Sequence, residues 1–152
     1  MEIKEKDEFM VVGLEIKSSV QECMKNNPHP KLWEDFMKRV DEIKNKKGDI
    51  VYGVSEEISK ENCDFYSMAC IEVEDLDNIP EGMKGKVVPK SRYAVFEHKG
   101  KANDLTETYR KIYEEGMPKS GLKQKKIWLE VYDDRYIHDS DDSLMEVWVS
   151  VE

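Results

Sequence analysis

The sequence lacks a long apolar run. Its 152 residues are 39% hydrophobic and 38% charged, and no segment approaches the roughly 18 consecutive apolar residues that can span a bilayer. The N-terminal MEIKEKDEF also lacks the apolar centre of a secretory signal. We therefore expect a cytoplasmic protein with no membrane partner.

Cysteine is scarce, and its spacing does not suit a metal. Cys23, Cys63 and Cys70 are an odd number of thiols without a metal-ligand pattern, as expected for free cysteines in a reducing compartment. The sequence shows no recognisable nucleophilic triad, metal-ligand cluster or glycine-rich phosphate loop. We therefore expect no metal and no cofactor.

Positive charge is in deficit, with a formal net charge of −9. The densest basic run, Lys44–Lys47, is typical of a solvated helix end, where cations suit the helix dipole. A nucleic-acid surface needs Lys and Arg clustered on one face. We expect no direct nucleic-acid binding.

What the chain does contain is two segments of strict period-two alternation, Ile127–Tyr132 (IWLEVY) and Met145–Val151 (MEVWVSV). One face of each is aliphatic and predicts core. The opposite face carries two carboxylates among aromatic rings: Trp128, Glu130 and Tyr132 in the first segment, then Leu144, Glu146 and Trp148 in the second. If the two strands pair as a simple hairpin, both carboxylates share one face and repel each other. Such a face predicts one wall of a ligand cleft; the alternative is a homodimer interface lined by the two tryptophans.

The order strand, helix, strand, strand occurs twice. The first set is 8–17, 32–43, 50–55 and 65–74; the second is 91–99, 105–113 and the two segments above. We predict one α+β domain over 1–152, with a duplicated β-α-β-β unit in half 1 (1–75) and half 2 (91–152), joined by a linker (76–90). Each half would form an antiparallel sheet covered by one helix, with a pseudo-twofold axis and a ligand cleft between the halves. A chance likeness of two amphipathic units is the alternative. The first half would add Tyr66 and Met68 to the cleft.

Four segments resemble the GyrI-like domain, the effector-binding domain of some AraC-class and MerR-class regulators, which also occurs as a stand-alone protein. They are Tyr93–Gly100 (YAVFEHKG), Ile112–Gly121 (IYEEGMPKSG), Leu129–Tyr132 (LEVY) and Glu146–Val149 (EVWV). The resemblance covers essentially the whole chain and is most specific from Tyr93 onward. It implies the duplicated fold with a ligand groove between the halves. In the multidrug-binding members a strand glutamate among aromatic rings receives hydrophobic cations; Glu130 matches that position, and Glu146 is a candidate second acid.

The chain begins with the binding domain itself, without an upstream helix-turn-helix, so we expect a stand-alone protein that cannot read a promoter alone. The main hypothesis is a protein that binds hydrophobic or cationic drugs or toxins. The first alternative, implied by the resemblance, is a hydrolase of strained, cyclopropane-type compounds with Glu130 as general acid or base. The second is a protein-interaction inhibitor like the gyrase inhibitor that gives the domain its name.

Overall fold

The computed structural model describes all 152 residues. The strands are β1 (Glu2–Lys6), β2 (Phe9–Ser19), β3 (Lys46–Ser59), β4 (Asp64–Val73), β5 (Lys84–Val88), β6 (Ser91–Lys99), β7 (Gln124–Tyr132) and β8 (Leu144–Val151). The α-helices are α1 (Val20–Lys25), α2 (His29–Arg39), α3 (Leu105–Lys111) and α4 (Met117–Ser120). Short 3₁₀ turns occupy Val40–Glu42 and Ala102–Asp104, and a π turn over Ile112–Gly116 joins α3 to α4. No helix has the length and apolar character needed to cross a membrane.

All eight strands form one antiparallel sheet in the order β1-β6-β8-β7-β3-β4-β2-β5. The predicted α+β class with antiparallel strands is confirmed, whereas the prediction of two separate sheets is wrong. β3 of the first half pairs with β7 of the second half, from Val51 opposite Tyr132 to Glu56 opposite Ile127. Two separate sheets would leave β3 and β7 as long edges of unpaired N–H and C=O groups, and their pairing removes both edges.

The strand order reads the same from either end when β1–β4 are matched with β5–β8. At the centre Gly53 of β3 pairs with Glu130 of β7. Ala69 of β4 lies beside Gly53 as Val147 of β8 lies beside Glu130. A pseudo-twofold axis between β3 and β7 therefore relates the halves in strand order and in register. That a duplication of the sequence produced this symmetry stays a prediction.

The two edge strands were missed or left as linker in the sequence analysis. β5 lies within the predicted linker, and β1 has the sequence EIKEK, whose charges give it no apolar face. Each precedes the first strand of its own half yet pairs with the first strand of the other, β1 with β6 and β5 with β2. A pairing this distant along the chain leaves no signal in local alternation.

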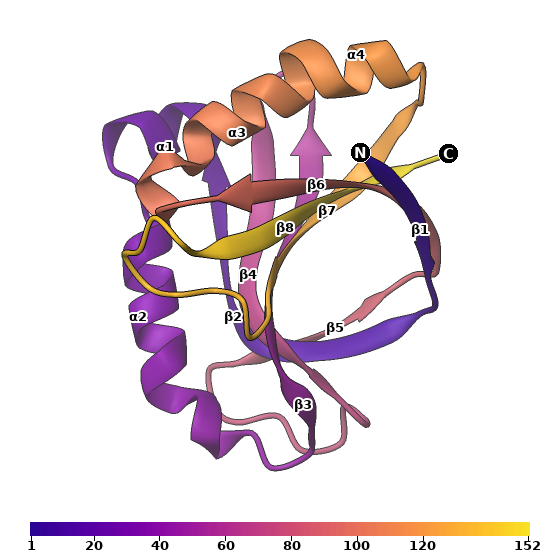
Figure 1. Ribbon diagram of the computed structural model, residues 1–152. Coiled ribbons are helices and arrows are strands. Elements are labelled where there is room, and N and C mark those ends of the chain that lie inside the picture. The colour runs from indigo at the N-terminus through magenta and orange to yellow at the C-terminus, as the bar shows by residue number, and fades with distance from the viewer.

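The sheet is curled, with α2 and the α3–α4 segment packed on its outer face and the edge strands β1 and β5 on the side away from those helices (Figure 1). The inner face closes on itself around a buried cluster drawn from β2 to β7 that includes Tyr52, Met68, Tyr93, Leu129 and Val131. Residues of β2 and β4 pack against α2, and residues of β6 and β8 pack against the α3–α4 segment. The amphipathic stripe predicted from residue 32 thus covers the sheet as expected.

The helical segment from Leu105 extends past its predicted end. The π turn carries the chain beyond residue 113 into α4, where Pro118 occupies the first turn and needs no N–H partner. Gly121, with φ of 69°, closes α4. A β-carbon on Gly116 would lie 2.5 Å from Cε1 of Phe96, so the glycine is what lets this segment approach the sheet. Between the predicted elements 8–17 and 32–43, the chain also forms α1, capped by the Ser19 hydroxyl, which accepts from the backbone N–H of Glu22 at 3.1 Å.

Candidate functional site

The register of β7 against β8 separates the predicted site residues onto two faces. Leu129 pairs with Trp148, and Glu130 pairs with Val147. Because paired residues of an antiparallel sheet point to the same side, Trp148 and Glu146 project inward with Leu129, whereas Glu130 projects outward. The prediction that Glu130 and Glu146 share one face is wrong.

The cause is a one-residue difference in register. The connection over 133–143 is long enough to set the register independently of a tight turn. The irregularity between Gln124 and Trp128 shifts the pairing by two residues and so leaves the faces unchanged. A slip of one residue transfers a whole set of side chains to the other face. Alternation within each strand was therefore read correctly, while the relation between the two strands was not.

Glu130 lies half-buried near the centre of the outer face. The hydroxyl of Tyr132 donates to its Oε1, and the hydroxyl of Tyr109, from α3, donates to its Oε2, each at 2.6 Å. These phenols are its hydrogen-bond partners, and it forms no ion pair with a lysine or arginine. No lysine or arginine of the protein therefore neutralises the Glu130 carboxylate.

Burial raises the pKa of Tyr109 and of Tyr132 well above 10, and the negative charge of Glu130 acts in the same direction. Both phenols therefore keep their protons at neutral pH. As obligatory donors they fix the orientation of the carboxylate, and each occupies one of its oxygens.

Aromatic rings surround this carboxylate. The ring of Trp33, from α2, meets the ring of Tyr132 edge-on at 5.0 Å between centroids, and Tyr136 meets Tyr132 from another side at 4.9 Å. Tyr113 stacks on Tyr109 at 6.2 Å. Farther along β7, Trp128 packs against Phe65 of β4 at 5.7 Å. We call this set the aromatic cluster: Trp33, Phe65, Tyr109, Tyr113, Trp128, Tyr132 and Tyr136.

Gly53 makes room for the carboxylate. A β-carbon built on it would lie 3.3 Å from Oε1 of Glu130 and 3.5 Å from Cζ2 of Trp33. The first half thus contributes an empty position directly opposite the acid of the second half. The acid and the space it occupies come from one strand pair, β3 and β7.

His29 lies at the start of α2, on the same side of the sheet. Its Nδ1 lies 2.9 Å from Oδ1 of Asn27 and its Nε2 lies 3.0 Å from Oγ of Ser67, while its ring stacks on Phe65 at 6.2 Å. Burial lowers the pKa of His29, and the charge of Glu130 raises it to a smaller extent. The imidazole is therefore neutral at pH 7.

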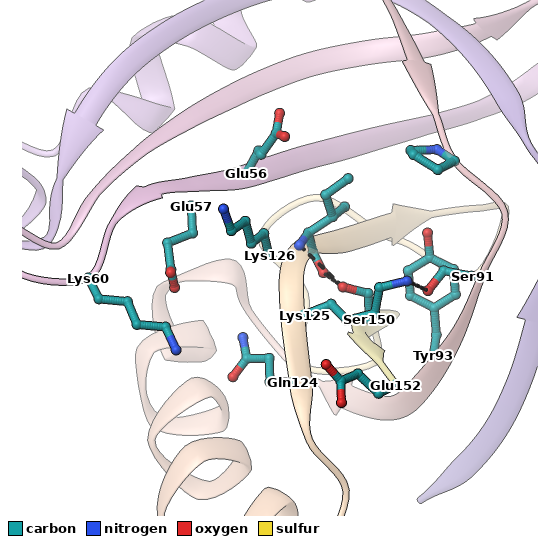
Figure 2. A pocket seen from close by; sticks show the side chains of 12 residues that line it. Glu56, Glu57, Lys60, Ser91, Tyr93, Gln124, Lys125, Lys126, Ser150 and Glu152 are labelled. Carbon is teal, nitrogen blue, oxygen red and sulfur yellow. Dashed lines mark hydrogen bonds between the residues drawn. The ribbon is translucent and has the colours of Figure 1, made fainter.

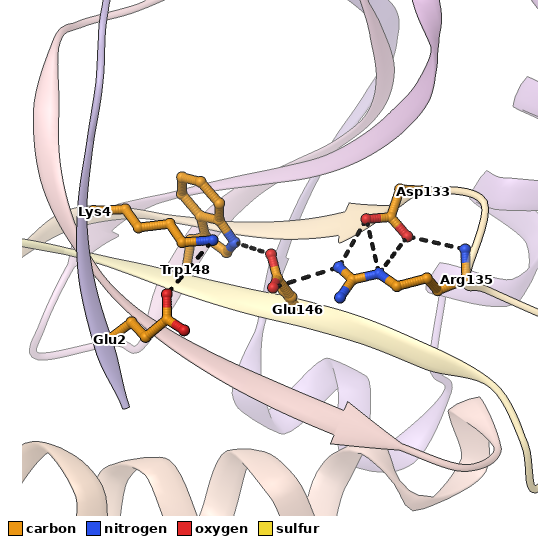
Figure 3. A network of polar contacts seen from close by, with 6 residues as sticks. All are labelled: Glu2, Lys4, Asp133, Arg135, Glu146 and Trp148. Atoms are coloured by element: carbon orange, nitrogen blue, oxygen red, sulfur yellow. Dashed lines mark hydrogen bonds and ion pairs between the residues drawn. The ribbon is translucent and has the colours of Figure 1, made fainter.

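The inner-face residues of the prediction are already engaged by the chain (Figure 3). The indole N–H of Trp148 donates to Oε1 of Glu146 at 2.9 Å, and Arg135 pairs with Oε2 at 3.4 Å while it also binds Asp133. The ammonium of Lys4 lies 5.5 Å from the Trp148 ring centroid. Glu146 thus has an internal cation, unlike Glu130. A ligand-binding role for Glu146 and Trp148 stays a prediction.

Tyr66 and Met68 also lie on the inner face. Met68 is 1% exposed within the inner cluster. Tyr66 is partly exposed, with the ammonium of Lys86 at 5.7 Å from its ring centroid. Neither belongs to the group around Glu130, and their ligand roles also stay predictions.

A hollow of about 400 Å³ opens at one end of the curled sheet, between β3, β7 and β8 (Figure 2). Lysine and glutamate side chains face each other across it: Lys60, Lys125 and Lys126 with Glu56, Glu57 and Glu152. Three charges of each sign select neither anions nor cations. None of the predicted site residues lines it.

Several contributors to the outer face were not predicted as site residues: Trp33, Phe65, Tyr109, Tyr113, Tyr136 and His29. Trp33 and Tyr109 follow the apolar stripes of their helices, so their spacing indicated packing. The stripes do pack, but against the sheet face that carries Glu130, so the same spacing serves both roles. An available signal was the alignment of the two halves, which places Gly53 on Glu130 and so marks the centre of the sheet.

A family model described as Cass2, integron-associated effector binding protein, matches residues 2–151. The transcriptional regulator BrlR of Pseudomonas aeruginosa is 35% identical over 136 residues, which are 88% of this chain and 48% of BrlR. The chain thus spans about half the length of this curated relative.

Two solved structures share the fold. An integron cassette protein from the mobile metagenome of Vibrio cholerae is 17% identical with a TM-score of 0.79, over 99% of this chain and 95% of that one. SAV2435 bound to tetraphenylphosphonium is 14% identical with a TM-score of 0.77, over 99% of this chain and 93% of that one. At these identities the likeness concerns the fold alone.

Proposed function

Because the chain belongs to the Cass2 family of integron-associated effector binding proteins, and so is a GyrI-like effector-binding domain, we propose that it binds a hydrophobic organic cation at Glu130. The family resemblance inferred from the sequence is confirmed by this match, and small-molecule binding follows as the general function. The ligand class and the binding residues are the proposal.

The observation that carries the proposal is the half-buried Glu130 carboxylate without a cationic partner. Removing a charge from water is costly unless an opposite charge compensates it. The two phenols satisfy the oxygens as hydrogen-bond acceptors but bring no positive charge. A cation that reaches Glu130 therefore gains an attraction that no group of the protein itself supplies.

The aromatic cluster favours a cation with an apolar body. A cation over an aromatic face gains roughly 0.5–2 kcal/mol per ring, most when desolvated. Trp33 and Tyr132 stand edge to face beside the acid, so rings are available on more than one side. A small hydrated ion would lose water without filling this apolar surround, whereas a bulky organic cation replaces water by ring contacts.

The neighbour SAV2435 supports the choice of tetraphenylphosphonium as the first probe. This cation spreads one positive charge beneath four phenyl rings, which is the chemistry that the aromatic cluster and Glu130 suit. Tetraphenylborate has the same shape and the opposite charge, so the pair isolates the contribution of charge.

The test is isothermal titration calorimetry with both ions at pH 7.5. We expect wild type to bind tetraphenylphosphonium and to bind tetraphenylborate far more weakly. Glu130→Gln should weaken phosphonium binding by about tenfold or more, equivalent to about 1.4 kcal/mol. Glu146→Gln, on the inner face, is the matched control and should bind as wild type does. Equal affinity for both ions, or an unchanged affinity in Glu130→Gln, would contradict the proposal.

The other hypotheses stay predictions: a hydrolase that uses Glu130 as acid or base, an inhibitor of another protein, a homodimer, the absence of nucleic-acid contacts and a cytoplasmic location. The first is checked by mass spectrometry of any bound compound after prolonged incubation. A chemically altered compound whose formation stops in Glu130→Gln would favour the hydrolase over the binding protein.

A further inference from the structure

We propose that His29 sets the acid limit of ligand binding: when its imidazole takes up a proton, a second positive charge competes with the bound cation for Glu130. This inference rests on the proposed function: it concerns how pH regulates cation binding at the same site. His29 is not among the residues predicted from the sequence to form the site.

The geometry fixes the imidazole in place. Asn27 Oδ1 can only accept, so the 2.9 Å contact makes Nδ1 the donor. Nε2 then carries the lone pair and accepts from the Ser67 hydroxyl at 3.0 Å. With the ring stacked at 15° on Phe65, His29 cannot swing into solvent without losing three contacts. A proton taken up at Nε2 therefore stays inside the site.

The groups that face His29 offer one counter-charge. Glu130 of β7 meets Gly53 beside Trp33, which lies one turn along α2 from His29, and its charge raises the pKa of the imidazole. From α1, the Cys23 thiol lies 3.8 Å from Nδ1. β4 contributes Ser67 and Phe65, which are uncharged. On α2 itself, Lys31 is paired with Asp35 at 2.7 Å on the exposed side. A protonated His29 would thus draw on the same carboxylate that the ligand uses.

Competition for one carboxylate has a reciprocal consequence. If the imidazolium weakens cation binding, a bound cation must make His29 harder to protonate by the same factor. Burial already lowers the pKa of His29 from its ordinary 6.5. A bound organic cation should lower that pKa further, and cation affinity should fall as the pH is lowered through it.

The first measurement is an NMR pH titration of the histidine ring protons, with and without saturating tetraphenylphosphonium. The chain has three histidines. His98, whose ring nitrogens bond Thr108 and Lys101, and His138, in the β7–β8 connection, are internal controls. We expect the ligand to lower the pKa of His29. An unchanged His29 with ligand bound overturns the inference, and this test needs no variant.

The second measurement compares tetraphenylphosphonium affinity at pH 7.5 and 5.5 in wild type and His29→Gln. The glutamine amide can still donate and accept but cannot become charged in this range. Wild type should lose about three- to tenfold more affinity than the variant over this interval. Identical losses would overturn the role of His29.

The two proposals fail in different ways. If tetraphenylphosphonium does not bind wild type at pH 7.5, the proposed function and this inference fall together. If it binds at pH 7.5 but His29 neither shifts nor alters the pH profile, the inference fails and the proposed function stands.

Discussion

Gly53 and Glu130 are direct partners across the central strand pair, and the Glu130 carboxylate lies over the backbone of Gly53, which has no side chain. The two positions are equivalent under the pseudo-twofold axis that passes between them, yet one carries a glutamate and the other a glycine. Two acids at these positions would repel each other at short range. The site is therefore asymmetric although the strand order around it is symmetric.

Gly53→Ala should weaken cation binding with little loss of stability. Gly53 does not have a positive φ, so alanine causes no backbone strain. Its β-carbon, however, would lie 3.3 Å from Oε1 of Glu130 and displace the carboxylate. We expect tetraphenylphosphonium affinity to fall about three- to tenfold, measured by calorimetry, and the melting temperature to stay within a few degrees. Unchanged affinity would show that the ligand does not depend on this orientation of the acid.

The sequence was sufficient to predict elements that carry their own pattern. The strand over 91–99 has the predicted bounds, and alternation correctly grouped Trp128, Glu130 and Tyr132 on one side of β7. Both faces of that strand are at least partly buried, one in the inner cluster and one beneath the helices. The predicted sheltered face at Glu130 thus follows from residue types alone.

What could not be predicted depends on contacts between distant segments. Whether Val147 or Glu146 lies opposite Glu130 depends on the connection over 133–143, which has no period. The same holds for β1, whose partner β6 begins at Ser91. Local patterns determine which side chains share a face of one strand, but not which faces of two strands coincide.

The Tyr109 and Tyr132 phenols should resist ionisation and make the protein sensitive to alkali. Their pKa is raised well above 10 in the folded chain. Their contribution to stability is thus fully present below about pH 10, the pKa of an unfolded tyrosine, and is lost as the pH rises through the folded-state values. In Glu130→Gln the burial remains but the negative charge is gone, so these tyrosines should ionise at lower pH. Absorbance at 295 nm during an alkaline titration measures this difference, and coincident curves for the two proteins would contradict it.

His29 should make the protein less stable in acid. Its folded-state pKa is lowered from 6.5 by burial, so the unfolded chain binds the proton first. The stabilising contribution is present above about pH 6.5 and is lost as the pH falls through the folded-state value, at about 1.4 kcal/mol per unit of lowering. Urea unfolding at pH 7.5 and 5.0 should show a smaller loss in His29→Gln than in wild type. Equal losses would mean that the imidazole is hydrated when protonated.

Glu146→Gln should lower the stability of the protein and leave tetraphenylphosphonium affinity unchanged, whereas Glu130→Gln should weaken that affinity. The glutamine oxygen can still accept from the indole N–H of Trp148, but the 3.4 Å ion pair with Arg135 is lost. Arg135 keeps its contacts with Asp133, the closest at 2.7 Å, and is partly exposed. The free energy of unfolding should therefore fall by only about 0.5–1 kcal/mol.

Glu146→Leu sharpens the comparison. It leaves the Trp148 N–H without its acceptor as well, and should cost about 1–3 kcal/mol. Both Glu146 variants should bind tetraphenylphosphonium as wild type does, because their side chain points to the inner face, away from Glu130. Urea unfolding and calorimetry on the same samples give the two quantities. If Glu146→Gln lost as much phosphonium affinity as Glu130→Gln, the cation would have to enter the inner face, and the aromatic cluster around Glu130 would not be its site.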